Sequence, residues 1–440
     1  MPRDVPHAAD RTALHRTALA PLVLIVSLFF LWGMANNLND VLIAQFRKAF
    51  TLGDLQSGLV QSAFYMGYFL FAVPAALFMR RFGYKAAVVL GLTLYGVGAL
   101  LFFPATQIRV YEAFLGALFV IAGGLAFLET SANPLILVMG EAEGSARRLN
   151  LAQAFNPLGS ITGVVVGRQF IFSAAEPDRA QLALMSPRQL ETLHAAQAHA
   201  VQAPYLVIGL FVLAWAVLIA VTRFSKAASE TNVDDGGALG DIRGLLARPR
   251  YLFGVAAQFF YVGAQVGVWS FLIRYAEREV GAPERTAASY LIGSLVAFMA
   301  GRFAGVALMG RIRPDRLTAV FGAINLGLCL VGAFAGGVAG LWALVAASFF
   351  MSVMYPTIFA LSVKDLGPLT KLGSSFLVMA IIGGAVLTAA MGWLSDSASI
   401  ALAMIIPAFA FGVVALFALT AGAALTAHAR LAPADLESSP

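Results

Sequence analysis

Long apolar runs recur along the chain and are separated by short polar or basic segments. A run of roughly 20 apolar residues is long enough to cross the hydrocarbon core of a bilayer as an α-helix. The pattern predicts an all-α membrane protein with twelve transmembrane helices. The predicted spans are residues 19–44, 56–79, 86–104, 110–138, 149–173, 203–222, 251–276, 287–309, 316–336, 339–362, 371–394 and 399–426.

Composition supports a membrane protein. Of the 440 residues, 60% are hydrophobic and only 12% are charged, whereas a soluble chain of this length needs more charge to cover its surface. The first apolar run is too long for the core of a signal peptide, and no small-residue cleavage site follows it. We therefore expect an uncleaved first helix.

The polar segment 223–250 divides the spans into six and six. A basic turn follows the second span ("MRRFGYK") and the eighth ("GRIRPDR"), and the fourth and tenth spans each carry a proline in mid-span. In the fourth span we expect Asn133-Pro134 to break the helix and free carbonyls. Two related six-helix halves are typical of transporters. The predicted divisions are a tail at 1–18, a half at 19–222, a linker at 223–250, a half at 251–426 and a tail at 427–440.

The basic residues predict the orientation. With the N-terminus in the cytoplasm, the inside segments hold about 19 of the 29 lysines and arginines, which is the bias of the positive-inside rule. Both termini are then cytoplasmic. The basic residues are spread over many short loops, so we expect contact with the lipid bilayer and no nucleic-acid partner.

Two acidic residues lie clearly within predicted spans, Asp40 in the first and Glu129 in the fourth. An acid near the centre of a transmembrane helix costs about 3 kcal/mol to insert, and usually has a function. All five histidines lie in the termini or in one loop. Any proton coupling must therefore run through Asp40, Glu129 or both, although Glu129 as a neutral structural hydrogen-bonding group remains an alternative.

The first span carries further polar residues in "FFLWGMANNLNDVLIAQF". Asn36 and Asp40 share one helix face at a spacing of four, Asn37 lies beside that face, and Trp32 lies one turn before it. A polar face with an adjacent aromatic ring suits a sugar, whose hydroxyls need paired donors and acceptors and whose C–H face packs on an aromatic. The alternative is that the asparagines bond to neighbouring helices.

Other spans add polar and aromatic residues that together predict one central polar cavity. Gln153 and Asn156 share a face of the fifth span, and Tyr355 precedes Pro356 in the tenth. Arg302, in the eighth, is the one basic residue deep in a span; it either forms an ion pair or snorkels to the cytoplasmic face. A stripe in the seventh span comprises Gln258, Tyr261, Gln265 and Trp269.

Several glycines inside the spans predict close helix contacts: Gly116, Gly123, Gly124, Gly159, Gly163, Gly383 and Gly384. No Walker motif is present, so we expect no ATP-driven transport, and the histidines and the single cysteine, Cys329, form no metal-binding pattern. Cys329 lies inside an apolar span, and we expect it to be a packing residue. We expect no cofactor and no metal. An enzyme acting on lipid-linked sugar is disfavoured, because neither of the two long loops, 174–202 and 223–250, carries an acid pair or a metal site. An uncoupled facilitator and a sugar sensor remain alternatives.

The chain resembles the major facilitator superfamily, and within it the family of L-fucose:proton symporters, from about Leu28 to about Leu419. The resemblance is carried by "FFLWGMANNLNDVLIAQF", "GLVQSAFYMGYF", "LETSANP", "RRLNLAQAFNPLGS", "QFFYVGAQVGVWSFLIRYA", "MYPTIFALSVKDLG" and "GSSFLVMAIIGGA". Unlike the superfamily's usual acidic-basic loop motif, the first basic turn lacks the acid, which leaves the gating ion pair of that loop in doubt.

The resemblance implies a monomeric inner-membrane importer that carries sugar and a proton inward by alternating access. It implies that Asp40 and Glu129 are the protonatable pair and that Asp40 also contacts sugar. The implied sugar-binding amides are Asn37, Gln153 and Asn156, and the implied cavity aromatics are Trp32, Trp269 and Tyr355. Relatives in this family carry glucose, galactose or N-acetylglucosamine, so the sugar is L-fucose or one of these.

Overall fold

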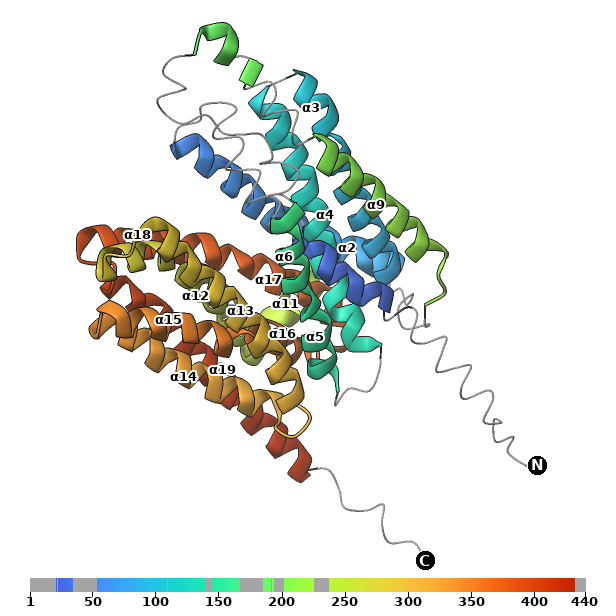
Figure 1. Cartoon of the computed structure of the whole chain (residues 1–440). Coiled ribbons are helices and arrows are strands. Elements are labelled where there is room, and N and C mark those ends of the chain that lie inside the picture. The colour runs from blue at the N-terminus through green and yellow to red at the C-terminus, as the bar shows by residue number, and fades with distance from the viewer. Residues whose placement is uncertain are drawn as a thin grey trace, which may run out of the picture. The chain divides into compact units, whose positions relative to one another are not determined.

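The computed structural model describes residues 21, 23–34, 54–108, 110–139, 144–166, 185–190, 192–193, 202–224 and 237–431. Within these ranges the regular structure is helical, with no β-strand, which confirms the predicted all-α class (Figure 1). Among the described residues, nine stretches are long and apolar enough to cross a membrane. They account for ten of the twelve predicted spans, and the other two, 19–44 and 149–173, are described in part.

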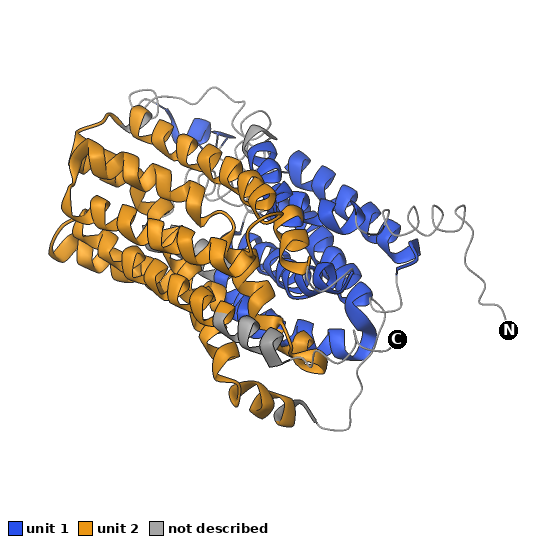
Figure 2. Cartoon of the chain, turned by 90° about the horizontal axis from the view of Figure 1, so that it is seen from below, with its two compact units in different colours: residues 1–142, 152–235, 374–379 blue, residues 143–151, 236–373, 380–440 orange. Residues whose placement is uncertain are grey.

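Contacts divide the chain into two compact units (Figure 2). Unit 1 comprises residues 1–142, 152–235 and 374–379, and unit 2 comprises residues 143–151, 236–373 and 380–440. Most of α5 therefore belongs to unit 2 and part of α17 to unit 1, so the halves 19–222 and 251–426 stay a prediction.

Unit 1 is built from apolar helices that follow one another along the chain. They are the helix Val23–Met34, α2 (Asp54–Leu100), α3 (Phe102–Ile108), α4 (Tyr111–Val138), α6 (Phe155–Val166) and α9 (Gln202–Val221). The segment α2 is two helices in one, because Gly83 lies between them at φ 83° and ψ 170°. Only glycine adopts such a conformation without strain, so the chain can break at this position. Gly83 belongs to the predicted basic turn "MRRFGYK", so the break falls where the sequence predicts a turn.

Glycines let the helices of unit 1 pack closely. A Cβ atom on Gly124 of α4 would lie 2.5 Å from the backbone nitrogen of Tyr95 on α2, and one on Gly159 of α6 would collide with the carbonyl oxygen of Phe30. Contacts shorter than a normal carbon–nitrogen approach exclude any side chain here. The predicted close approach is confirmed at these positions, whereas a Cβ on Gly116 would meet no atom of the described residues within 4 Å.

Unit 2 holds a second bundle in which α14 packs on α15 and α19, and α12 packs on α18 and α19. The predicted linker 223–250 contains a helix, α11. The elements of this part of the chain are α5 (Ser145–Gln153), α11 (Gly237–Leu246), α12 (Pro249–Val280), α13 (Glu284–Leu308), α14 (Pro314–Phe334), α15 (Gly337–Met351), α16 (Met354–Val363), η2 (Gly367–Leu369), α17 (Thr370–Met379), η3 (Ala380–Ile382), α18 (Gly383–Ser397), η4 (Leu402–Met404) and α19 (Ile405–Leu431).

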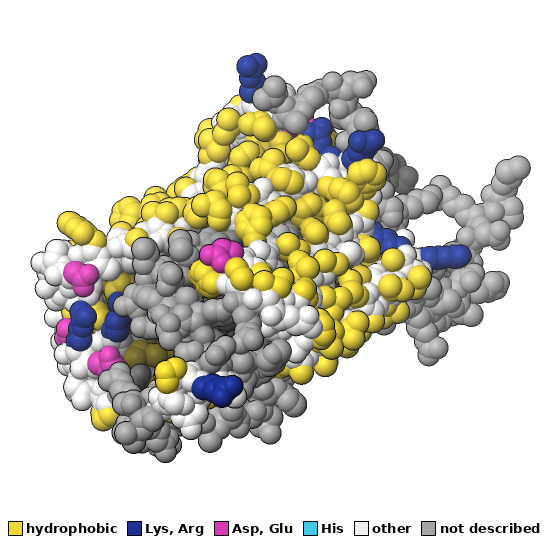
Figure 3. Space-filling model, turned by 90° about the horizontal axis from the view of Figure 1, so that it is seen from above, with side chains coloured by type: hydrophobic (Ala, Val, Ile, Leu, Met, Phe, Trp, Pro, Cys, Tyr) yellow, Lys and Arg dark blue, Asp and Glu magenta, His cyan; other side chains and the backbone are white. Residues whose placement is uncertain are grey.

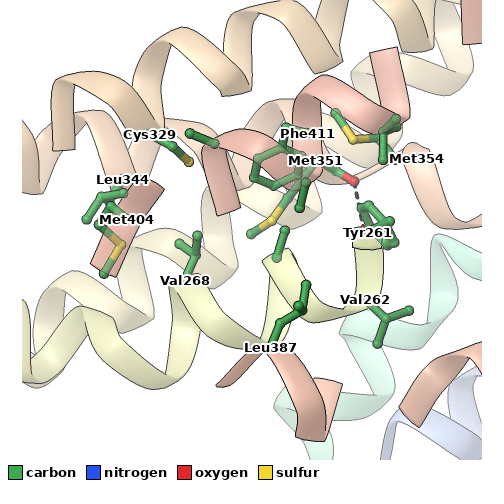
Figure 4. Close-up of a cluster of buried hydrophobic side chains, with 14 of the residues drawn as sticks. Tyr261, Val262, Val268, Cys329, Leu344, Met351, Met354, Leu387, Met404 and Phe411 are labelled. Carbon is green, nitrogen blue, oxygen red and sulfur yellow. Dashed lines mark hydrogen bonds between the residues drawn. The ribbon is translucent and has the colours of Figure 1, made fainter. Parts of the chain in front are cut away.

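The core of unit 2 is a cluster of buried aliphatic, aromatic and sulfur-containing side chains (Figure 4). Cys329 lies in this cluster and is completely buried, which confirms its predicted role in packing. The short helix α5 is also held in unit 2, because the Asn150 side-chain nitrogen Nδ2 donates to Oγ1 of Thr357 at 3.0 Å.

Apolar side chains also cover much of the outer surface (Figure 3). Val221, Phe334 and Trp393 each expose about seven-tenths of their side chains, at 72%, 71% and 73%. Exposure on this scale is unfavourable in water and favourable against lipid tails.

Prolines affect the helices in two different ways. Pro134 lies inside α4, which continues to Val138, so the break predicted at Asn133-Pro134 is wrong. The chain does break just before Pro157 and Pro356: α5 ends at Gln153, and α15 ends at Met351. In both broken cases the proline follows a residue predicted to bind sugar, Asn156 or Tyr355.

Candidate functional site

Glu129 lies in the most enclosed part of unit 1. Every residue of α4 from Ile121 to Ile136 is buried, and Glu129 itself is only 4% exposed. Leu125, one turn earlier, and the neighbouring Leu128 are completely or almost completely buried, so the carboxyl is carried on an apolar helix. Burying a carboxyl in an apolar helix is costly, so such a group is expected to have a function.

Tyr68 of α2 connects Glu129 to an aromatic residue. The Trp32 indole Nε1 donates a hydrogen bond to the Tyr68 hydroxyl oxygen at 2.9 Å, and both side chains are buried. Tyr68 and Glu129 also interact electrostatically. A predicted sugar-packing ring and a predicted proton-carrying acid therefore share one neighbour.

Two amides extend this group. The Gln153 side-chain nitrogen Nε2 donates to Oδ1 of Asn133 at 3.1 Å, and both residues are buried. Asn133 follows Glu129 by four residues and so lies on the same face of α4. The hydrogen bond fixes the Gln153 amide beside the helix that carries Glu129.

Asn156 lies at the contact between α6 and the first helix. A Cβ on Gly33 would collide with the carbonyl oxygen of Asn156, and Ser160 Oγ donates to the carbonyl oxygen of Gly33 at 3.3 Å. Asn156 is half-buried, whereas Gln153 is buried. In unit 1, Tyr68 lies between Trp32 and Glu129, Gln153 is bonded to the helix of Glu129, and Asn156 lies against the helix of Trp32.

Asn37 and Asp40 lie outside the described residues. Their assignment to sugar and proton binding stays a prediction, as does the shared helix face of Asn36 and Asp40.

In unit 2, the four residues of the predicted stripe on α12 differ in burial. Gln258 and Tyr261 are completely buried, whereas Gln265 and Trp269 are half-buried. The Trp269 indole Nε1 donates to Oγ of Ser348 at 3.1 Å, and its ring packs edge-on against Phe298 with centroids 5.0 Å apart. Ser348 in turn contacts the hydroxyl of Ser294. The hydrogen bond and the ring packing therefore hold the indole in one orientation.

The other predicted aromatic, Tyr355, is 9% exposed, and its ring lies 6.3 Å from that of Tyr261. Gln258 differs from its neighbours: within the described part of the chain, neither polar atom of its amide has a hydrogen-bond partner. A buried amide without a partner is destabilising by about 1–3 kcal/mol.

Arg302 is buried inside unit 2. It is 4% exposed, its Nε donates to the carbonyl oxygen of Ser352 at 2.8 Å, and its guanidinium carbon lies 4.7 Å from the centroid of the Phe298 ring. The predicted alternative of snorkelling to the membrane surface is wrong, because the charge is satisfied in the interior by a carbonyl and an aromatic face.

Sequence reasoning missed three residues of these groups, namely Tyr68, Asn133 and Ser348. Asn133 had a signal, the spacing of four from Glu129. Tyr68 and Ser348 had none, because a tyrosine and a serine within apolar runs are common packing residues. In the described ranges, no group of three or more His, Cys, Asp or Glu side chains is placed to hold a metal ion.

Comparison with known proteins gives consistent matches. Residues 24–376 match the family model of the Major Facilitator Superfamily. The chain is 48% identical over 409 residues to the L-fucose-proton symporter of Escherichia coli strain K12, covering 92% of this chain and 93% of that protein.

A second curated relative carries a different name. The glucose/galactose transporter of Brucella abortus biovar 1 is 35% identical over 402 residues, which cover 90% of this chain and 93% of the relative.

The fold also matches a solved structure, the crystal structure of the Escherichia coli fucose:proton symporter. It superposes with a TM-score of 0.87 at 45% identity, covering 92% of this chain and 99% of that chain.

Proposed function

Because the chain belongs to the Major Facilitator Superfamily, we propose that it is a multi-pass membrane transporter that imports L-fucose together with a proton. It is a transporter and not an enzyme. The proposal rests on the 48% identity to an L-fucose-proton symporter over 92% of the chain. Within the molecule, the observation that carries it is the buried carboxyl of Glu129 beside predicted sugar-binding residues.

Glu129 supplies the chemistry that coupling requires. A carboxyl within a membrane span can bind a proton and release it when the carrier opens to water, as in the proton relays of transporters. One proton entering across about 100 mV contributes roughly 2.3 kcal/mol, which sustains a sugar gradient of nearly 50-fold. The proton is the proposed coupling ion, and no other cofactor is invoked.

The remaining residues take the roles that the sequence predicts. Asp40 binds sugar and exchanges a proton, and the amides of Asn37, Gln153 and Asn156 orient the sugar hydroxyls. Trp32, Trp269 and Tyr355 pack against the apolar face of the sugar ring. Gln258 and Gln265 complete the polar contacts from α12.

A second candidate function is transport of another monosaccharide. It is favoured by the 35% identity to a glucose/galactose transporter. In this alternative the chain is a symporter or an uncoupled facilitator for glucose, galactose or N-acetylglucosamine. The uncoupled form has no need of a protonatable Glu129.

The proposed setting is the cell inner membrane, with both termini in the cytoplasm and the chain acting as a monomer in the lipid bilayer. The basic loops support this orientation. The boundaries 19–222 and 251–426 remain the proposed extent of the two halves, joined by 223–250.

The sugar is identified by competition. Purified protein in liposomes takes up radiolabelled L-fucose under an inward proton gradient, and unlabelled sugars are added in turn. We expect L-fucose to compete strongly, and D-glucose, D-galactose and N-acetylglucosamine to compete weakly. Strong competition by one of these three, with weak competition by L-fucose, would move the specificity to that sugar.

A further inference from the structure

The break between α15 and α16 leaves backbone carbonyls without their helical donors. Ser352 and Val353 lie between the two helices, and Pro356 follows in the first turn of α16. The carbonyl of Ser352 would normally accept from the N–H four residues later, but that residue is Pro356, which has none. In an apolar interior such a carbonyl needs another donor.

Arg302 of α13 supplies that donor. Its Nε lies 2.8 Å from the carbonyl oxygen of Ser352. The guanidinium also lies over the ring of Phe298, one turn earlier on the same helix, which provides a second favourable contact for the charge. A buried cation thus stabilises the carboxyl end of α15, where the helix dipole is negative.

Tyr261 of α12 contacts both sides of the break. Its hydroxyl donates to the carbonyl oxygen of Met351 at 2.9 Å, the hydrogen bond drawn as a dashed line in Figure 4. The backbone of Tyr355 forms a further hydrogen bond with the same hydroxyl. One phenol group therefore replaces a direct helical hydrogen bond between the residues at positions 351 and 355.

Close packing holds α13 against this segment. A Cβ on Gly301 would collide with the carbonyl oxygen of Phe349, and a Cβ on Gly305 would collide with the Val353 side chain. The two glycines flank Arg302 by one and three positions. The backbone of α13 therefore lies directly on the break, and Arg302 reaches Ser352 from a fixed base.

We propose that Tyr261 and Arg302 are positioning residues for sugar binding: they hold the α15–α16 break in one shape and so set the orientation of Tyr355. The inference rests on the proposed function, which assigns Tyr355 to the sugar. Neither residue touches the sugar. Loss of either donor leaves a carbonyl unsatisfied, the break relaxes, and Tyr355 leaves its binding orientation.

The first test compares two tyrosines of α12. Tyr261→Phe removes only the hydroxyl at the break. The matched control is Tyr275→Phe, because Tyr275 is also completely buried and its hydroxyl donates to a backbone carbonyl, that of Gly332, at 2.7 Å. L-Fucose affinity is measured by calorimetric titration. We expect Tyr261→Phe to weaken binding about five- to tenfold, the effect of one buried hydrogen bond, and Tyr275→Phe to leave binding unchanged.

The second test asks whether Tyr261 acts through Tyr355. In a Tyr355→Ala background, Tyr261→Phe should cause no further loss of affinity, because the side chain that it positions is gone. Additive losses would overturn the inference, as would an unchanged affinity of the single Tyr261→Phe variant. Arg302→Lys should bind sugar better than Arg302→Met; equal affinities for these two variants would remove Arg302 from the proposal.

The wild-type protein separates this inference from the proposed function. If it binds no L-fucose but binds another monosaccharide, the proposed specificity fails. The double-mutant cycle of Tyr261→Phe and Tyr355→Ala is then carried out with that sugar. If it binds L-fucose and the cycle is additive, the specificity stands and the positioning role fails.

Discussion

At the scale of single residues, the proposed function depends on buried polar side chains in helices that are otherwise apolar. Glu129 is surrounded by buried residues of its own helix, and Tyr68 links its surroundings to Trp32 through a 2.9 Å hydrogen bond. Gln153 is held by Asn133. Each of these groups costs free energy to bury, and the hydrogen bonds between them offset part of that cost.

Glu129→Gln mimics a permanently protonated carboxyl. We expect sugar exchange across the membrane to continue, because the neutral side chain keeps its place, and accumulation driven by a pH gradient to fall from tens-fold to near equilibrium. Wild-type uptake should decline as external pH rises, because the inward proton gradient becomes smaller, and exchange by the variant should not depend on pH. Uptake of labelled sugar into liposomes at several pH values measures both.

Glu112→Gln is the control, since Glu112 is exposed on the same helix. Undiminished accumulation by Glu129→Gln would rule out its coupling role.

Tyr68→Phe removes the acceptor of the Trp32 indole. We expect the KM for sugar to rise about fivefold, because the indole loses the hydrogen bond that orients it. Initial uptake rates at varied sugar concentration give the KM. The control is Tyr205→Phe, a buried tyrosine of unit 1 whose ring stacks on Phe102 at 4.2 Å. Equal KM values for wild type and Tyr68→Phe would show that the bond does not serve binding.

Gln258→Met tests a buried amide that lacks partners among the described residues. We expect the sugar-free protein to gain about 1 kcal/mol of stability, because an apolar side chain of similar volume has no polar atoms to satisfy. We also expect weaker sugar binding, because Gln258 is a proposed sugar ligand. Thermal unfolding and sugar titration measure the two effects. Unchanged sugar affinity would make Gln258 a structural residue only.

At the scale of helices, glycine contacts and helix breaks determine where the functional residues lie. Gly33, Gly159 and Gly163 bring the first helix and α6 into backbone contact, and this contact places Asn156 beside the helix of Trp32. The breaks before Pro157 and Pro356 set the local backbone of Asn156 and Tyr355.

Gly159→Ala should destabilise the protein by about 1–3 kcal/mol, because the added methyl group would collide with the carbonyl oxygen of Phe30. Thermal unfolding in detergent measures the loss. Gly116→Ala provides the comparison, since its Cβ would meet nothing within 4 Å, and alanine favours a helix more than glycine. A similar melting temperature for Gly159→Ala and wild type would contradict the close contact.

The sequence predicts the helices well and their local breaks less well. Apolar length identifies spans, because the bilayer thickness imposes it. The effect of a proline depends on neighbouring helices: Pro134 continues within α4, whereas Pro356 follows a break at which Tyr261 and Arg302 supply donors to two carbonyls. Those donors come from residues roughly 50 and 90 positions away in the chain, and no local pattern indicates them.

The candidate site could be predicted only in part, because some of its residues are identified by partners that are distant in the chain. Glu129 is recognisable in sequence, because a carboxyl within an apolar span is rare. Tyr68 and Ser348 are recognisable only once their hydrogen bonds to Trp32 and Trp269 are known. The two alternatives for Arg302 were drawn from its own span alone, and both missed the carbonyl of Ser352 on another helix.

At the scale of the whole molecule, the chain is a carrier that uses the proton gradient to accumulate a sugar. Membership of the superfamily and 48% identity to an L-fucose-proton symporter over 92% of the chain support a carrier of this kind. The central claim is that sugar and proton move together, since an uncoupled facilitator has no need of a protonatable Glu129.

Proton movement on addition of sugar tests that claim most directly. Purified protein is placed in liposomes with a pH-sensitive dye outside, and L-fucose is added without a pre-formed pH gradient. If sugar and proton enter together, the external solution becomes alkaline with the wild-type protein and does not with Asp40→Asn. Entry of L-fucose with no change in external pH would contradict the account and favour an uncoupled facilitator.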